Sequence, residues 1–315
     1  MNNYLDKQIL EAAQIIKQNG VVAFPTETVY GLGANALDNE ATAKIFALKN
    51  RPQTNPLIVH VANLEQAQSI GIFNDNAFKL ASLWPGPLTM VLPLKKDAGI
   101  ATNVTANLAT IGIRIPAHPT ALKLIEYSSL PIAAPSANPS GYISSTKPEH
   151  IEEHFAQQEV FHLKSDNNCI YGLESTIVDL TSSEITVLRY GFITPKTIEN
   201  ILGKKVLISS SNIIKAPGMM NKHYAPQARV RLNAKYLAKD EIGLDFGNSN
   251  LFKNGYALNL SEKGDLTEAA GNLYSMLRML DKYAKDHPTI NTIAVSSIPN
   301  ENIGLAINDR LRRAA

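Results

Sequence analysis

The chain of 315 residues contains one cysteine and one tryptophan, and its formal net charge is only +2. A single cysteine, Cys169, excludes an internal disulfide and any cysteine-rich metal site. The balanced charge argues against nucleic acid as the principal ligand, although a local basic patch stays compatible with it. No apolar run approaches the roughly 20 residues of a membrane-spanning helix, and the first residues do not resemble a targeting peptide. We therefore expect a cytoplasmic protein that makes no membrane contact.

Several familiar catalytic signatures are also missing from the sequence. Neither GxxxxGK[ST] nor GxGxxG occurs, so neither a P-loop nor a dinucleotide-binding turn of that type is expected. The absence of HExxH, paired CxxC and GxSxG disfavours zinc-dependent hydrolysis and nucleophilic-serine chemistry. A hydrophobic content of 44% with 18% charged residues describes an ordinary globular protein, and the length favours two domains.

Apolar periodicity predicts an α/β fold in two parts. Helical spacing is expected near residues 5–16, 40–48, 74–84, 119–127 and 148–156, and strands near 21–26, 56–62, 88–94, 110–116, 131–138, 175–180 and 185–190. This alternation is typical of a domain built on a twisted mixed sheet with helices, which we place at residues 1–203.

The regular pattern is lost after this first domain and then returns. Residues 204–229 are irregular, contain the stretch APGMMNKHYAP and are predicted to form an interdomain linker. Strands near 243–246, 256–260 and 292–296, with helices near 266–285 and 305–312, predict a small Rossmann-like α/β domain at residues 230–315.

The most informative segment is FALKNRPQTNPLIVH, residues 46–60. A helical stretch ends in two spaced cations, Lys49 and Arg51, and Pro52 then forces an extended path. Two cations held at a helix-to-strand transition form a plausible phosphate clamp, because Arg offers a planar fork and Lys a point charge. The alternative is a solvated basic pair that complements the helix macrodipole.

Three other polar segments lie at strand ends: PTETVYGLG at 25–33, PSANPSGYIS at 135–144, and LESTIVDL at 173–180 with Arg189 just beyond. Hydroxyl and amide groups on glycine-containing turns can hold phosphate or a nucleobase, but each segment is equally compatible with an ordinary turn. Because ligands of open α/β sheets bind beyond strand ends, we expect one cradle for a polyanion and a small polar molecule. Acidic residues are sparse at these places.

The strand TIGIRIP, residues 110–116, carries an arginine on one face only. Ile111, Ile113 and Ile115 fall on one face, and Arg114 falls on the other. Burying an arginine is costly unless it meets an anion, so we favour an anionic partner over a solvent-exposed side chain.

These motifs resemble those of the L-threonylcarbamoyladenylate synthases, the YrdC-like family, in its two-domain form. The family's K-x-R element stands as Lys49-Asn50-Arg51, and its S-x-N element stands as Ser136-Ala137-Asn138. PTETVYGLG, RPQTNPLIVH, TIGIRIP and ESTIVDL are similar to family blocks and occur in the family's order. The resemblance covers roughly residues 8–202, and it continues through APGMMNKHYAP and the ending GLAINDRLRRAA.

The resemblance implies a nucleotidyltransferase reaction. L-Threonine, bicarbonate and ATP would give L-threonylcarbamoyl-AMP, pyrophosphate and water, as the first step toward N6-threonylcarbamoyladenosine at position 37 of tRNAs that read ANN codons. Mg2+ would accompany ATP, held mainly by the phosphates, and its protein ligands are undetermined. The implied partners are the downstream machinery that transfers the threonylcarbamoyl group and, through a further contact, tRNA.

The resemblance also assigns residues to ligands. Threonine would be held by Thr28, His60, Arg114, Ala134 and Ser175, with Arg114 on its carboxylate. ATP would be held by Arg51, Asn55, Thr110, Ser136, Asn138, Ser144, Arg189 and Tyr224. Lys49, Arg51 and His60 are the candidate catalytic residues, His60 as proton acceptor or, equally, as an orienting contact.

Two other functions and one conformational hypothesis stay open. A non-catalytic module that binds double-stranded RNA or tRNA would also need the cations. A carbamoyltransferase of hydrogenase maturation shares the fold, but its zinc-finger and acylphosphatase parts are missing here. His223 and Tyr224 in the linker could form a lid over a labile intermediate, so cutting near Gly203 is expected to leave the first domain folded but to change turnover.

Overall fold

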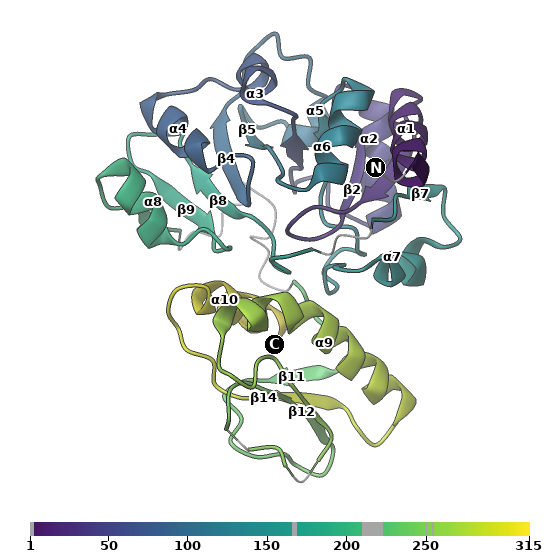
Figure 1. Cartoon of the computed structure of the whole chain (residues 1–315), viewed down its shortest axis with the longest axis vertical. Helices are drawn as coiled ribbons and strands as arrows, with labels where there is room; N and C mark the ends of the chain where they lie inside the picture. Colours follow the sequence, from purple (N-terminus) through teal and green to yellow (C-terminus); the bar gives the residue numbers. More distant parts are fainter. Residues whose placement is uncertain (1–2, 166–168, 210–222, 250, 254) are drawn as a thin grey trace.

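Two separate sheets organise the chain (Figure 1). The computed structural model describes residues 3–165, 169–209, 223–249, 251–253 and 255–315. A ten-stranded mixed sheet belongs to the first part of the chain, and a four-stranded parallel sheet belongs to the second. The predicted fold class, a twisted mixed sheet followed by a small α/β domain, is confirmed.

The first sheet has the order β10-β9-β8-β4-β5-β3-β6-β2-β1-β7. Strand β3 runs parallel to β5, and β4 runs parallel to β8, whereas β4 and β5 are antiparallel. Its strands are β1 (Val21–Phe24), β2 (Gly31–Asn35), β3 (Ile58–His60), β4 (Leu88–Pro93), β5 (Thr110–Arg114), β6 (Ile132–Ala133), β7 (Val160–His162), β8 (Thr176–Asp179), β9 (Thr186–Arg189) and β10 (Leu207–Ile208).

Several helices of the first domain begin where a short polar side chain caps them. Asp38, Asn63 and Thr194 each accept a hydrogen bond from a backbone N–H in the first turn of the helix that follows. The predicted helix at 74–84 is divided into α4 and a 3-10 turn at Ala81–Leu83. The helices are α1 (Asn3–Lys17), α2 (Asn39–Lys49), α3 (Leu64–Ile70), α4 (Asp75–Leu80), α5 (Thr102–Thr105), α6 (Pro119–Ser128), α7 (Pro148–Phe155) and α8 (Pro195–Leu202).

The two faces of the large sheet have different environments. Ile111, Ile113 and Ile115 all belong to the largest buried apolar cluster, which confirms the predicted alternation along β5. Ile58 lies on the opposite face, in a small cluster with Val91 and its neighbours from β8 and β9. Because side chains alternate along a strand, His60 and Arg114 project from this second face, where they are register partners across β3 and β5.

The second domain is a small parallel sheet with two helices. Its strands β11 (Arg229–Arg231), β12 (Glu241–Asp245), β13 (Ala257–Asn259) and β14 (Thr292–Val295) lie in the order β11-β14-β12-β13. Asp265 caps α9 (Leu266–Asp286), and α10 (Gly304–Ala314) packs against α9. Both helices lie on the side of the small sheet that faces the first domain (Figure 1).

The two domains share one buried apolar cluster. Val29, Ile143 and Leu173 of the first domain belong to the same cluster as Leu273 and Leu277 of α9. The backbones of the two domains also lie close together at Gly172, whose φ is +64°. A Cβ at this position would lie 2.7 Å from both Ala270 O and Gly271 Cα. This shared cluster places the second domain directly against loops that connect strands of the large sheet.

The predicted linker is only partly within the described residues. Strand β10, within residues 204–229, pairs with β9 and so adds to the first sheet beyond Gly203. The segment APGMMNK at 216–222 lies outside the described residues, whereas His223 and Tyr224 lie inside them.

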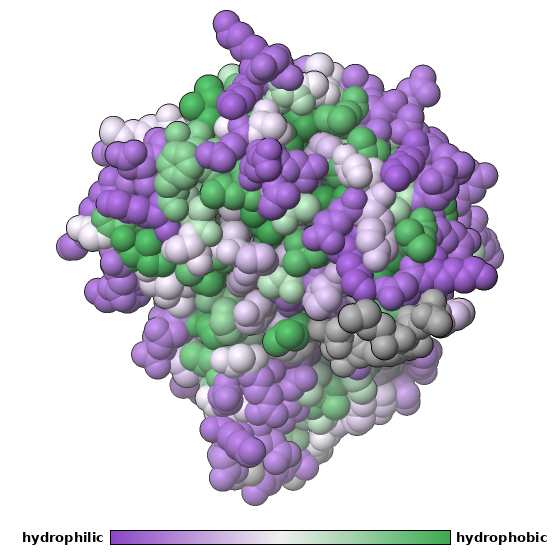
Figure 2. Space-filling model, turned by 45° about the horizontal axis from the view of Figure 1, so that its top comes forward, coloured by the Kyte–Doolittle hydropathy of each residue, from purple (hydrophilic) through white to green (hydrophobic). Residues whose placement is uncertain are grey.

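The outer surface is mixed in character. On the face drawn in Figure 2, hydrophobic side chains occur in groups between hydrophilic ones. None of the helices in the described parts of the chain is both long and apolar enough to cross a bilayer.

Candidate active site

One pocket gathers residues from segments that are far apart in the sequence. It encloses about 520 Å3 of empty space, including its opening to solvent. Among the residues predicted to bind substrates, those that line it are Thr28, Arg51, His60, Ala134, Arg114, Ser136, Ser175, Arg189 and Tyr224. The guanidinium groups of three arginines from different loops and strands thus share one cavity.

Arg114 lies at the carboxyl end of β5 and is held on three sides. Its Nη1 donates to Thr28 Oγ1 at 2.9 Å, and its Nε donates to Gly86 O at 3.3 Å. Its Nη2 lies 2.5 Å from Glu27 Oε1, and both side chains are buried. The expectation that acidic residues are sparse near this site is wrong for Glu27. Its presence could have been recognised from the sequence, because it lies between two threonines in PTETVYGLG.

The conformation at the end of α2 determines where the Arg51 side chain points. Asn50 adopts a left-handed conformation with φ 49°, which turns the chain back on itself after the helix. The Arg51 guanidinium then donates to Asn55 O at 3.0 Å and to Pro56 O at 2.8 Å. Burial, with the nearby charge of Arg189, lowers the pKa of Arg51 to about 9. A buried cation that donates to carbonyl oxygens is stabilised further by an anion, which the pocket is placed to receive.

Arg189 and Ser175 form another part of the pocket wall. Arg189 Nε donates to Ser175 O at 3.0 Å, and Nη2 donates to Ser175 Oγ at 3.1 Å. Ser175 Oγ also lies 2.7 Å from Thr89 Oγ1. Gly191 allows this wall to form, because a Cβ there would lie only 2.4 Å from Thr176 N.

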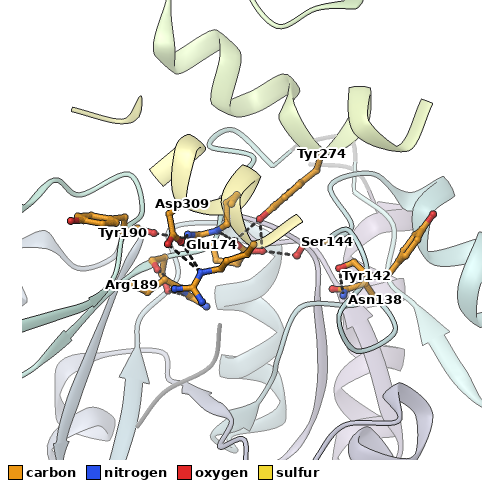
Figure 3. A network of polar contacts seen from close by, with 11 residues as sticks. Asn138, Tyr142, Ser144, Glu174, Arg189, Tyr190, Tyr274 and Asp309 are labelled. Atoms are coloured by element: carbon orange, nitrogen blue, oxygen red, sulfur yellow. Dashed lines mark hydrogen bonds and ion pairs between the residues drawn. The ribbon is translucent and has the colours of Figure 1, made fainter. Parts of the chain in front are cut away.

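Glu174 is the carboxylate that lines the pocket in the described part of the chain. It accepts hydrogen bonds from Ser144 Oγ at 2.5 Å and from Tyr274 Oη at 2.9 Å, and Figure 3 shows Tyr274 reaching it from the second domain. Burial alone would raise the pKa of Glu174, but the charges of Arg310 and Arg189 and the bond from Ser144 outweigh burial and lower it to about 2. Glu174 is therefore ionised. Its role could not be predicted from the sequence, because Tyr274, which binds it, is 100 residues away.

Some predicted residues lie behind the pocket wall rather than in it. Lys49 Nζ donates to Ser136 O at 2.5 Å and also to Asn138 O, so it ties down the loop that follows β6. Burial, and then the charge of Arg51, lower the pKa of Lys49 well below its ordinary value. Asn138 donates from Nδ2 to Pro139 O and Tyr142 O.

The remaining predicted ATP residues have different positions. Asn55 supplies its carbonyl oxygen to Arg51, and Ser144 donates to Glu174. Thr110 begins β5, four residues before Arg114, a separation of roughly 13 Å along a strand. It does not line the pocket among the described residues.

Comparisons with known proteins cover both domains. The family model described as "Telomere recombination" matches residues 14–191, and the model described as "Threonylcarbamoyl-AMP synthase, C-terminal domain" matches residues 193–315. The chain is 38% identical to the threonylcarbamoyl-AMP synthase of Bacillus subtilis, over 98% of this chain and 93% of that protein. It is 39% identical to the same enzyme of Pyrococcus abyssi, over 96% and 93%.

The chain belongs to the threonylcarbamoyl-AMP synthase family. A crystal structure of the P. abyssi protein Sua5 in complex with L-threonine shares its fold, with a TM-score of 0.88, 36% identity and coverage of 98% of this chain and 94% of that one. Membership confirms the predicted nucleotidyltransferase over the non-catalytic RNA-binding module. The match to both family models also favours this enzyme over the carbamoyltransferase alternative.

His60 enters the enzyme's pocket as a neutral side chain. Burial and the charge of Arg114 lower the pKa of His60 to about 3. His223 is buried in the same pocket, and burial likewise lowers its pKa to about 3. Both imidazoles are therefore uncharged at neutral pH, where they can accept a hydrogen bond but add no positive charge.

These two histidines predict how stability depends on pH. Below pH 6.5 the unfolded chain takes up a proton on each histidine, and the folded chain does so only near pH 3. Stability is therefore lost as pH falls through this window, by about 2 kcal/mol per histidine between pH 7 and pH 5. Urea unfolding of wild type and His60→Gln at both pH values measures the effect. We expect wild type to lose about 2 kcal/mol more than the variant, and equal losses would show that His60 is not buried as a neutral group.

Proposed function

We propose that this chain makes L-threonylcarbamoyl-AMP from L-threonine, bicarbonate and ATP and releases pyrophosphate, as the first step of threonylcarbamoylation of adenosine 37 in tRNAs that read ANN codons. The observation that carries the proposal is the convergence of Arg51, Arg114 and Arg189 on one pocket, whose carboxylate among the described residues, Glu174, is already paired with Arg310. The named activity of the relatives and the threonine complex of the P. abyssi protein support it.

Threonine is assigned to the side of the pocket around Arg114. The guanidinium would take the carboxylate, because Thr28 and Glu27 already fix its plane. Ser175 and Thr28 offer hydroxyl groups for the substrate's own hydroxyl, and the backbone near Ala134 closes this side. Neutral His60 is the register partner of Arg114 across β3 and β5, so we assign the amino group of threonine to the space beside it.

ATP is assigned to the side formed by Arg51 and Arg189. Ser136 and Tyr224 line the same region, and Tyr224 Oη is buried without a hydrogen-bond partner in the described residues. Lys49, Asn55, Asn138 and Ser144 would act from behind, since their contacts hold the wall residues in place. Thr110 keeps its predicted role only if ATP extends to the far end of β5.

The reaction brings two anions together, and the pocket is built to reduce their repulsion. The threonine ammonium first loses a proton to water, and the free amine then attacks carbon dioxide, or bicarbonate with loss of water, to give a carbamate. Neutral His60, with a pKa of about 3, would orient the amine as a hydrogen-bond acceptor rather than take its proton. A carbamate oxygen then attacks the α-phosphorus of ATP, and the bond to pyrophosphate breaks. Arginines fixed before substrate arrives stabilise the charge that develops, and positioning alone can contribute on the order of 7–11 kcal/mol.

Magnesium would enter with ATP rather than occupy a protein site. The described residues contain no group of three or more His, Cys, Asp or Glu side chains placed to hold a metal ion. Glu174 is the carboxylate among the described lining residues, and its oxygens already accept bonds from Ser144, Tyr274 and Arg310. We therefore propose that phosphate oxygens and water hold the ion.

His223 and Tyr224 are proposed to cover the nucleotide. Both residues line the pocket, and both are anchored on the second domain. His223 N donates to Arg313 O at 3.0 Å, and the Tyr224 ring stacks on Tyr274 at 5.7 Å between centroids. Such a cover would shield a labile mixed anhydride from water.

A co-substrate test decides the proposed function. We expect pyrophosphate release from ATP to require both threonine and bicarbonate, and to fall by at least about tenfold with serine, which lacks one methyl group. The measurement is coupled pyrophosphate detection, with the adenylate product followed by chromatography. Absence of release together with salt-sensitive RNA binding would instead support the RNA-binding alternative.

A further inference from the structure

A second pocket lies in the second domain, at the carboxyl end of the small sheet. Asn233 and Ser296 line it beyond the ends of the neighbouring parallel strands β11 and β14. Asn300, from the loop between β14 and α10, and Asn308, from α10, line it as well. It encloses about 570 Å3 of empty space, including its opening to solvent. Ligands of parallel α/β sheets bind beyond this end of the strands, so the pocket lies where the fold favours a binding site.

Ser296 presents an unsatisfied hydroxyl group at this pocket. The residue is 4% exposed, and its Oγ has no hydrogen-bond partner among the described residues. Its backbone is fixed, because Ser296 N donates to Leu244 O at 3.0 Å. Leaving a buried hydroxyl unpaired costs free energy, and a bound group that forms a hydrogen bond with Oγ would remove that penalty.

The charge of the pocket favours an anion. Arg312 of α10 lines it, and no aspartate or glutamate lines it in the part of the chain that the structure describes. Asn233 adds a donor: its Oδ1 accepts a hydrogen bond from Ser297 Oγ at 3.3 Å, so its Nδ2 can donate to a ligand. A guanidinium, a hydroxyl and an amide are groups that bind the oxygen atoms of carboxylates and phosphates.

Hydrogen bonds hold the walls of the pocket in place. Asn308 Nδ2 donates to Ile298 O at 3.1 Å and so ties α10 to the loop that follows β14. Ala234 N donates to Val295 O at 2.8 Å, which fixes the turn after β11. The pocket is therefore formed before a ligand arrives, and binding needs little reorganisation.

This pocket is separate from the active site. Among the described residues, none lines both pockets. Each residue turns an α-helix by about 100°, so Asn308 and Arg312 lie on one side of α10 and Arg310 lies on the other. Arg310 donates to Glu174, which lines the active-site pocket. The two sides of one helix thus belong to different pockets.

We propose that the second domain binds a small organic anion in this pocket, where Arg312, the Ser296 hydroxyl and the Asn233 amide hold its carboxylate or phosphate group. Apolar side chains on the same walls cover the body of the ligand: Leu232, Val295, Ile298 and Leu311. The site is independent of the proposed function, because the proposed reaction uses none of these residues.

The full chain is titrated with two probes, inorganic phosphate for phosphate esters and acetate for carboxylic acids. The readout is methyl NMR of a chain labelled at Ile, Leu and Val, because methyl groups of these residues line both pockets. Val29 and Ile58 report on the active site, and the second pocket has its own reporters: Leu232, Val295, Ile298 and Leu311. We expect saturable shifts at the second-domain reporters, with a Kd on the order of 1 mM for one or both probes. Sodium chloride at matched ionic strength is the blank.

Three variants test the assignment of residues. Arg312→Met is expected to raise the Kd at least about tenfold, because it removes a charge-assisted hydrogen bond. Ser296→Ala is expected to raise it about fivefold. Arg229→Met is the matched control, an exposed arginine that begins β11 at the opposite end of the sheet, for which no change in Kd is expected. Thermal unfolding without ligand checks that each variant is folded, and Ser296→Ala is not expected to be destabilised, because its hydroxyl has no partner to lose.

The possible outcomes have separate meanings. Shifts at the second-domain reporters that Arg312→Met weakens would support the site, and the probe that produces them would identify the ligand as a phosphate ester or a carboxylic acid. Shifts no larger than those with sodium chloride, or an unchanged Kd in Arg312→Met, would overturn the inference. A response confined to Val29 and Ile58 would also overturn it, because the anions would then bind only in the active site. Failure of the co-substrate test would leave these results unchanged, so the two proposals fail separately.

Discussion

Replacing Arg114 with lysine is expected to lower kcat/KM for threonine by about a thousandfold, or roughly 4 kcal/mol of transition-state stabilisation. Lysine keeps the charge but loses the planar fork, which here binds Thr28 and Gly86 while it faces Glu27. A single ammonium paired with Glu27 would leave the substrate carboxylate without an oriented partner. Steady-state kinetics with threonine varied at saturating ATP measure the effect.

Two further variants test whether the loss is specific to Arg114 and its immediate surroundings. Lys123→Met removes a partly exposed cation that pairs with Asp6 on the surface, and we expect it to leave the kinetics unchanged. Glu27→Gln keeps Arg114 intact but weakens its rear support, so an intermediate loss of about tenfold is expected. If Arg114→Lys kept wild-type kcat/KM for threonine while remaining folded, the assignment of this arginine to the substrate carboxylate would be wrong.

Local pattern was sufficient to predict much of the fold. The isoleucine alternation in 111–115 placed one face of β5 in the core, and the period over residues 266–285 located α9 to within one residue. Strand β2 was missed because its sequence, GLGAN, contains two glycines and lacks the β-branched residues that mark strands. Helix α3 was missed because seven residues are too few to establish a helical period.

The sequence predicted individual site residues, but it did not predict the contacts between residues that are far apart in the chain. Motif resemblance selected Arg51, Arg114 and Arg189, but only the fold shows that they share one cavity. Lys49 belongs to the same motif as Arg51, yet its side chain turns to the carbonyl oxygens of a distant loop. Glu174 lies within the ESTIVDL segment, but its role could not be predicted from the sequence, because Arg310, which pairs with it, lies 136 positions further along the chain. Charge compensation between domains leaves no local pattern for a sequence to display.

The second large effect is expected from removing the second domain. The sequence predicted that a chain cut near Gly203 would fold and only change its turnover, but the structure gives reasons to expect more. Residues 1–209 alone would expose Val29, Ile143 and Leu173, which are buried against α9, and would remove the Arg310 cation that pairs with Glu174. Each Å2 of apolar surface that loses its cover costs roughly 25 cal/mol, so the loss of this interface destabilises the first domain. We therefore expect the fragment to unfold at a markedly lower temperature and to form no detectable product.

Fragment complementation tests whether this loss comes from docking or from chain continuity. When residues 1–209 and 210–315 are co-expressed as two chains, the interface can still form, and product formation is expected to recover to within about tenfold of the intact enzyme. Gly172→Leu in the full chain is the converse test. A side chain there would meet backbone atoms of Ala270 and Gly271 2.7 Å from its Cβ, so the domains would be forced apart without any cut. An isolated fragment with full activity would contradict this prediction, because the first domain would then need neither the apolar contacts with α9 nor the ion pair between Glu174 and Arg310.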